Sequence, residues 1–104
     1  MEQDFFKIPK VFVNGKYGYK NMETDSKILY GVLEYISRMD NNKKLMAKED
    51  TLFFEAPMEL LINLTGWHNK KIIKHLKELE EYGVLSTIWK GFDKPNRYYL
   101  FIQI

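Results

Sequence analysis

The densest group of residues that could do chemistry is a basic segment between His68 and Lys77. It reads His-Asn-Lys-Lys-Ile-Ile-Lys-His-Leu-Lys and contains no acidic residue. Lysine side chains neutralise phosphates, and asparagine or histidine can hydrogen-bond to base edges. A helix carrying such a row would suit duplex DNA. The candidate contacts on this segment are His68, Asn69, Lys70, Lys71, Lys74 and Lys77.

A second basic group lies near the end of the chain, around a turn that contains Gly91 and Pro95. A basic hairpin can follow the DNA backbone or enter the minor groove. Lysine acts as a point charge, so we assign it to affinity more than to specificity. The candidates in this hairpin are Lys90, Lys94, Asn96 and Arg97, with Arg97 as the first choice.

Each of these groups also has a purely structural interpretation. The lysines could solvate an exposed helix face and pair with Glu78 and Glu81 at helical spacing. Arg97 could pair with Asp93 across the hairpin tip. The aromatic residues of the hairpin could stack on single-stranded bases, but alternation along a half-buried strand explains them as well. These aromatic residues are Trp89, Tyr98, Tyr99 and Phe101.

Catalytic and metal chemistry have little support in the sequence. The two histidines, His68 and His75, lie seven residues apart with no acid-base constellation around them. No cysteine is present, and no histidine spacing typical of a metal site occurs. Gly15 and Gly18 lie near lysines but do not form a phosphate-binding loop. We therefore expect no enzyme, no cofactor and no metal.

Composition indicates a single globular domain over residues 1–104. The chain has 104 residues, 45% hydrophobic and 29% charged, with a formal charge of +2. The absence of cysteine excludes disulfides and favours an intracellular protein. No apolar run approaches the roughly 18 residues of a membrane span, and the N-terminus is acidic where a signal peptide is basic. We expect a cytoplasmic protein.

Apolar spacing predicts three helices, and β-branched and aromatic runs predict three strands. Gly66 and Gly83 follow the second and third helices, and Pro57 suits the first turn of the second. Turn-forming residues at 40–44 predict a loop after the first helix. The expected order is a helix at 24–39, a strand at 51–54, helices at 57–64 and 68–82, and strands at 84–89 and 98–102.

This order is typical of an α+β winged helix-turn-helix, with three main helices, a small antiparallel sheet and a C-terminal two-stranded wing. In that fold the second helix of the motif lies in the major groove and its other face packs on the core. The apolar spacing assigns the core face of this helix to Ile72, Ile73, Leu76 and Leu79.

The first twenty residues allow two interpretations. Asn14-Gly15 is typical of a hairpin turn, whereas Pro9-Lys10 could open a helical turn. Three phenylalanines in or near this segment are more apolar than a solvated terminus needs, so they could form a dimer interface. They are Phe5, Phe6 and Phe12.

Four segments carry a more specific resemblance, and they extend over almost the whole chain. They are Phe6-Lys-Ile-Pro-Lys10, Asp25-Ser-Lys-Ile-Leu-Tyr-Gly-Val-Leu33, Leu76-Lys-Glu-Leu-Glu-Glu-Tyr-Gly-Val-Leu85 and Lys94-Pro-Asn-Arg-Tyr-Tyr99. Together they resemble the N-terminal domain of the RepA-type plasmid replication initiators of Gram-positive bacteria. The motif at the start and the Lys-Pro-Asn-Arg-Tyr wing are the most specific parts of the match.

The resemblance implies a dimer that binds repeated double-stranded sequences in a plasmid origin. Its recognition-helix positions fall on His68, Asn69, Lys70, Lys71 and Lys74, and its wing motif on residues 94–97. Family members commonly place Ser or Thr before the recognition helix, where this chain has Trp67-His68. A separate DnaD-like C-terminal domain recruits the host replication machinery in that family, so we expect residues 1–104 to be an N-terminal fragment.

The expected function is therefore sequence-specific DNA binding that initiates plasmid replication. A dimer reading two major grooves on one face would place half-sites about 34 Å apart, or a multiple of that. Two alternatives remain open: a winged-helix transcription repressor, which would act without a recruiting domain, and a winged-helix protein-interaction module, which would show no salt-dependent DNA affinity.

Overall fold

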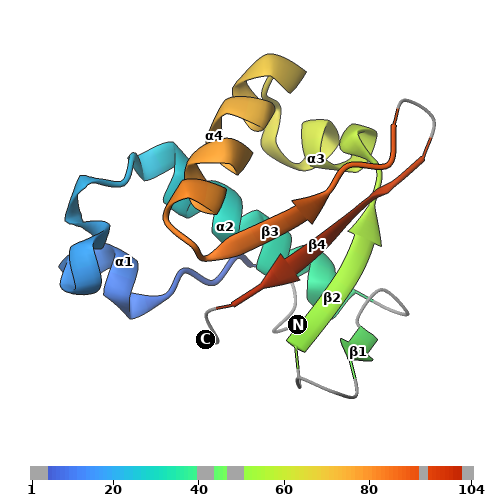
Figure 1. The fold of residues 1–104 in the computed structure, drawn as a ribbon. Helices are drawn as coiled ribbons and strands as arrows, with labels where there is room; N and C mark the ends of the chain where they lie inside the picture. Colours follow the sequence, from blue (N-terminus) through green and yellow to red (C-terminus); the bar gives the residue numbers. More distant parts are fainter. Residues whose placement is uncertain (1–4, 40–43, 47–50, 92–93, 102–104) are drawn as a thin grey trace.

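A computed structural model describes residues 5–39, 44–46, 51–91 and 94–101. Its elements follow the order α1, a 3-10 helix η1, α2, β1, β2, α3, α4, β3, β4. The helices α2, α3 and α4 with the antiparallel sheet make the α+β winged helix-turn-helix that the sequence predicts (Figure 1). No helix in these ranges is both long and apolar enough to cross a membrane.

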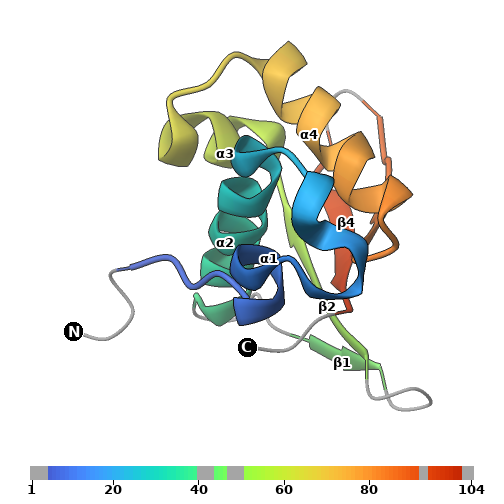
Figure 2. The ribbon, with the colours of Figure 1, turned by 90° about the vertical axis from the view of Figure 1, so that its left-hand side faces the viewer.

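The N-terminal region is helical, so of the two interpretations left open the helical turn is correct. Helix α1 spans Lys10–Asn14 and η1 spans Lys16–Asn21. Gly15 ends α1 with φ +77°, a left-handed conformation that glycine adopts without strain. Phe12 is fully buried and packs edge-to-face on Tyr30 of α2. That contact fixes α1 against α2 (Figure 2).

Helix α2 spans Thr24–Arg38, one residue shorter than predicted. Its buried residues include the whole run 29–33, which goes round the helix, so α2 is covered on more than one side. Gly31 lies where the N-terminal arm crosses the helix. A Cβ there would lie 3.2 Å from the Lys7 carbonyl oxygen and from Cγ1 of Ile8. The close approach of the arm to α2 therefore depends on the missing side chain.

The sheet has four strands in the order β1-β2-β4-β3, all antiparallel neighbours. The predicted strand at 51–54 is the start of β2, Thr51–Ala56. Strand β1, Lys44–Met46, was not predicted: the expected loop at 40–44 ends in a strand at Lys44, and residues 40–43 lie outside the described residues. Pairing with β2 supplies the hydrogen bonds that make this short segment a strand.

The wing strands are β3, Leu85–Ile88, and β4, Asn96–Leu100. Alternate residues of β4 are buried, which places Asn96, Tyr98 and Leu100 on the face toward the helices. Burial raises the pKa of Tyr98, whose ring packs beside Phe54 of β2. The β3–β4 hairpin projects beyond the core on the side of α3 (Figure 1).

Helix α3 spans Met58–Thr65 and α4 spans Asn69–Glu81. Pro57 stands at the N-cap, one position before the first helical residue, so its missing N–H costs nothing there. Gly83, with φ +76°, turns the chain from α4 toward β3. Side chains from α2, α3, α4 and the sheet then close a single core.

Candidate nucleic-acid interface

The turn between α3 and α4 is shaped by three consecutive residues. Thr65 Oγ1 donates to the Leu61 carbonyl at 2.8 Å and accepts from the Trp67 N–H at 3.0 Å. Gly66, with φ +73°, donates its N–H to the Ile62 carbonyl at 2.8 Å. This left-handed glycine ends α3 and directs the chain into α4, as a helix-turn-helix requires.

His68 begins α4 as its N-cap. Its Nδ1 accepts a long, 3.4 Å hydrogen bond from the Lys70 N–H, so histidine serves at a position where helices in general favour Ser, Thr, Asp or Asn. The predicted start of the helix at about residue 68 is therefore correct within one residue. His68 and Asn69 are both exposed at this end of α4, where a base-reading residue would be expected.

One face of α4 is buried, and it differs from the predicted one at a single position. Ile73 is only half-buried, and His75 takes the expected place in the core beside Ile72, Leu76 and Leu79. On a helix of 3.6 residues per turn, residue 75 lies closer to the centre of this face than residue 73. Apolar spacing placed Ile73 inside because it is apolar and adjoins the buried face, and it left out His75 because histidine is polar.

The opposite face of α4 presents Lys70, Lys74 and Lys77 to solvent. Of these, Lys74 lies 3.6 Å from a Glu23 carboxylate oxygen before α2. Lys71 turns to the side, where its Nζ is 3.0 Å from Asp25 and 4.4 Å from the centre of the Trp67 ring. The partners in these pairs are Asp25 of α2 and Glu23 at its N-cap, whereas the sequence suggested Glu78 and Glu81. The basic row is therefore partly neutralised along its α2 edge.

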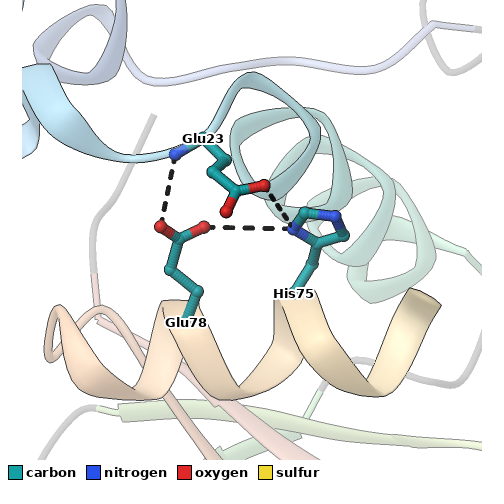
Figure 3. Close-up of side chains that lie close together, drawn as sticks. All are labelled: Glu23, His75 and Glu78. Carbon is teal, nitrogen blue, oxygen red and sulfur yellow. Dashed lines mark hydrogen bonds and ion pairs between the residues drawn. The ribbon is translucent and has the colours of Figure 1, made fainter. Parts of the chain in front are cut away.

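Beneath those lysines, a polar cluster joins α4 to the start of α2 (Figure 3). Ser26 Oγ lies 2.8 Å from His75 Nδ1 and donates to the Glu78 carboxylate. The Glu23 backbone N–H donates to the other Glu78 oxygen at 3.3 Å. These bonds satisfy the buried histidine and hold α4 at a fixed angle to α2.

Ligand atoms of Glu23, His75 and Glu78 also lie within 4.8 Å of one another. The sequence did not indicate this grouping, because Glu23 is remote from the other two along the chain. In this structure Ser26 hydrogen-bonds to both His75 and Glu78. We therefore interpret the cluster as a structural clamp between the two helices.

Of the four predicted residues of the wing, Lys90 and Lys94 are exposed. Asn96 is buried and Arg97 is half-buried. Asn96 is only 6% exposed, and its Oδ1 accepts from the Lys90 N–H at 3.0 Å. Its Nδ2 lies 3.5 Å from the Tyr98 hydroxyl oxygen. The Asn96 side chain therefore shapes the hairpin from inside, and its predicted contact with DNA stays a prediction.

Arg97, the first choice of the sequence analysis for a DNA contact in the wing, has partners within the sheet. It points to the face of the sheet opposite the helices, where its guanidinium is 3.1 Å from Glu55 on β2 and covers the Phe53 ring. Hydrogen bonds with Tyr99 and Glu55 raise the pKa of Arg97. The residue is thus engaged within the sheet, and its partner is Glu55 instead of Asp93, which lies outside the described residues.

An open groove of about 450 Å³ connects α4 to the wing. Asn69 and Ile73 line it from α4, Met58 from α3, and Trp89 and Lys94 from the wing. Asn96 and Gly91 also contribute. Helix α4 and the wing, which carry the two predicted basic groups, therefore form the two sides of one groove. Of the predicted residues, Asn69, Lys94 and Asn96 line it.

Similarity to known proteins agrees with this geometry. The family model described as replication initiator protein A (RepA) N-terminus matches residues 4–102. Two solved structures, titled "N-Terminal domain of DNA binding protein" and "Structure of Rep-DNA complex", each share 30% identity and a TM-score of 0.72, covering 99% of this chain and 78% of theirs. No curated protein matches. The chain belongs to the replication initiator protein A N-terminus family.

Proposed function

We propose that this domain binds double-stranded DNA with sequence specificity at repeated sites in a plasmid origin and so initiates replication. The observation that carries the proposal is the groove between α4 and the wing, which Asn69 of α4 and Lys94 of the wing line. Lys70, Lys74 and Lys77 are exposed elsewhere on α4, and Lys90 is exposed on the wing. Family membership and the similar Rep-DNA complex support it. The proposed role is binding, with no reaction catalysed by this domain.

The residues divide into two roles on this proposal. His68 and Asn69, at the N-terminal end of α4, read base edges, since this end of a recognition helix lies deepest in the major groove. Lys70, Lys74 and Lys77 contact phosphates beside that groove, and Lys71 does so after releasing Asp25. Lys90 and Lys94 of the wing contact the backbone of the adjacent groove.

A dimer is part of the proposal, and its interface must differ from the one the sequence indicated. Phe12 is fully buried within the domain, so it cannot meet a partner. Phe5 and Phe6 remain 49% and 42% exposed beside α2. We propose that they contribute to the contact between copies, and that host replication proteins act through a C-terminal domain.

The test is selection of bound duplexes from a randomised pool at about 0.15 M salt, where non-specific binding is weak, at 10⁻⁴ to 10⁻⁶ M. We expect one motif to be enriched, in two copies one helical turn apart or a multiple of that. Lys70→Glu should then weaken binding to the motif at least tenfold, whereas Lys10→Glu, the same charge change on α1, should leave it unchanged.

Failure to enrich a motif would contradict sequence-specific recognition. Equal losses for Lys70→Glu and Lys10→Glu would show that only net charge matters and would contradict α4 as the recognition helix. An absence of any salt-dependent DNA affinity would move the protein-interaction module to first place. Analytical ultracentrifugation with the enriched duplex measures the number of copies bound.

A further inference from the structure

Ile73 of α4, the proposed recognition helix, is an apolar residue that is not buried in the core. It is half-buried and lines the open groove, whereas its neighbour Ile72 is fully buried. Across the groove lies Trp89, directly after β3 and 44% exposed, and Met58 of α3 completes the apolar lining. Ile73, Trp89 and Met58 therefore give the groove an apolar lining, beside the polar Asn69 and Asn96 and the basic Lys94.

The chemistry of the surroundings restricts what can occupy this part of the groove. Lys94 lines it and Lys90 follows Trp89, so the occupant must accept positive charge beside it. On the proposed function, that occupant is a DNA duplex. At the base edges of the major groove a duplex offers one apolar group, the C5 methyl of thymine.

We infer that Ile73, supported by Trp89, forms a subsite for the methyl group of a thymine in the recognised sequence. The inference rests on the proposed function and deepens it by naming the base. Asn69 lines the same groove one helical turn before Ile73. Four residues of helix advance about 6 Å. Asn69 and the thymine subsite at Ile73 therefore lie on the same side of α4, one turn apart.

The test replaces each thymine of the enriched duplex in turn by deoxyuridine, which keeps base pairing and removes only the methyl group. For the wild-type domain we expect one or two positions per half-site at which uridine weakens binding about three- to fivefold. For Ile73→Ala, thymine and uridine should bind equally at that position. Val13→Ala, an exposed apolar change on α1, should keep the wild-type difference.

A second pair of variants keeps the result independent of folding. Ile73→Val retains part of the apolar contact and should give an intermediate ratio of thymine to uridine affinity. Trp89→Ala should reduce the ratio while the midpoint of thermal unfolding stays near the wild-type value, because Trp89 is exposed.

The outcomes separate the two proposals. Specific DNA binding with equal affinity for thymine and uridine at every position would overturn the methyl subsite and leave the proposed function standing. Persistence of the full difference in Ile73→Ala would assign the methyl contact to another residue and also overturn the inference. If no duplex is enriched at all, the proposed function fails first and the subsite falls with it.

Discussion

The Nζ of Lys71 on α4 lies 3.0 Å from Oδ2 of Asp25 in the first turn of α2. A second pair, Lys74 with Glu23, lies 3.6 Å apart beside it. Both are exposed, so each contributes little to the stability of the fold. Their consequence is electrostatic: two lysines of the proposed recognition helix have carboxylate partners before any phosphate arrives.

Asp25→Asn should therefore strengthen DNA binding, by about two- to fivefold at low salt. Lys71 would no longer have to exchange a carboxylate for a phosphate. Fluorescence anisotropy with a labelled duplex measures the change.

Lys71→Met provides the control, through a double-mutant cycle. With Lys71 absent, Asp25→Asn should have a smaller effect. An equal gain in both backgrounds would show that Asp25 acts only through the net charge of the domain.

Ser26→Ala should destabilise the fold by roughly 1–3 kcal/mol. The change removes the hydroxyl shared by His75 Nδ1 and the Glu78 carboxylate, and leaves the buried histidine and the partly buried carboxylate without that partner. Urea unfolding measures the free energy. Thr24→Ala, an exposed change in the same turn of α2, should alter it by less than about 0.5 kcal/mol. Similar losses in both variants would refute the clamp between α2 and α4.

Asn96→Ala and Lys94→Ala should weaken DNA binding for different reasons. Lys94 is proposed to contact a phosphate, so its loss should reduce the slope of log K against log salt by about 0.9. Asn96 shapes the hairpin through its bond to the Lys90 N–H, so its loss should lower the free energy of unfolding by about 1 kcal/mol. The slope should stay at the wild-type value.

Salt titrations and urea unfolding on the same two variants check this distinction. An Asn96→Ala domain of wild-type stability with a specific loss at one base pair would show that Asn96 reads DNA directly, as the sequence first indicated.

Because Tyr98 is buried, we expect the free energy of unfolding to fall at alkaline pH. Burial raises its pKa in the folded state, whereas the unfolded chain has a pKa of about 10. The folded state therefore holds the Tyr98 proton more tightly than the unfolded chain does. The stability that depends on this proton is fully present below a pH of about 10 and is lost as the pH rises through the pKa of the folded state. Urea unfolding at pH 9 and 11 should show a smaller fall for Tyr98→Phe than for the wild type. An equal fall in the free energy of unfolding for both proteins would show that the lysines and the other tyrosines account for the whole pH dependence.

The sequence by itself determined the order of the three main helices and of strands β2, β3 and β4, and most ends of those helices. Apolar spacing in α2 and α4 is periodic over several turns, and Pro57, Gly66 and Gly83 act on the backbone locally, so no distant contact is needed to place them. The basic character of α4 and of the hairpin is likewise visible in the residue types. The family motifs pointed to the same fold.

Tertiary structure decided which of those residues are free to act. Asn96 and Arg97 are neighbours in a basic turn, but strand alternation turns Asn96 toward the core and Arg97 to the opposite face, where Glu55 on another strand meets it. Strand β1 exists through its pairing with β2.

Tertiary structure also decided the environment of α4. The helical period predicts which residues share a face of the helix, but not which other elements pack against that face. Ile73 lies at the edge that meets the wing, and His75 enters the core because Ser26 and Glu78 satisfy its polar atom. Ser26 is 49 residues from His75 in the chain. Contacts over such separations depend on how the helices pack, and local sequence patterns carry no record of that packing.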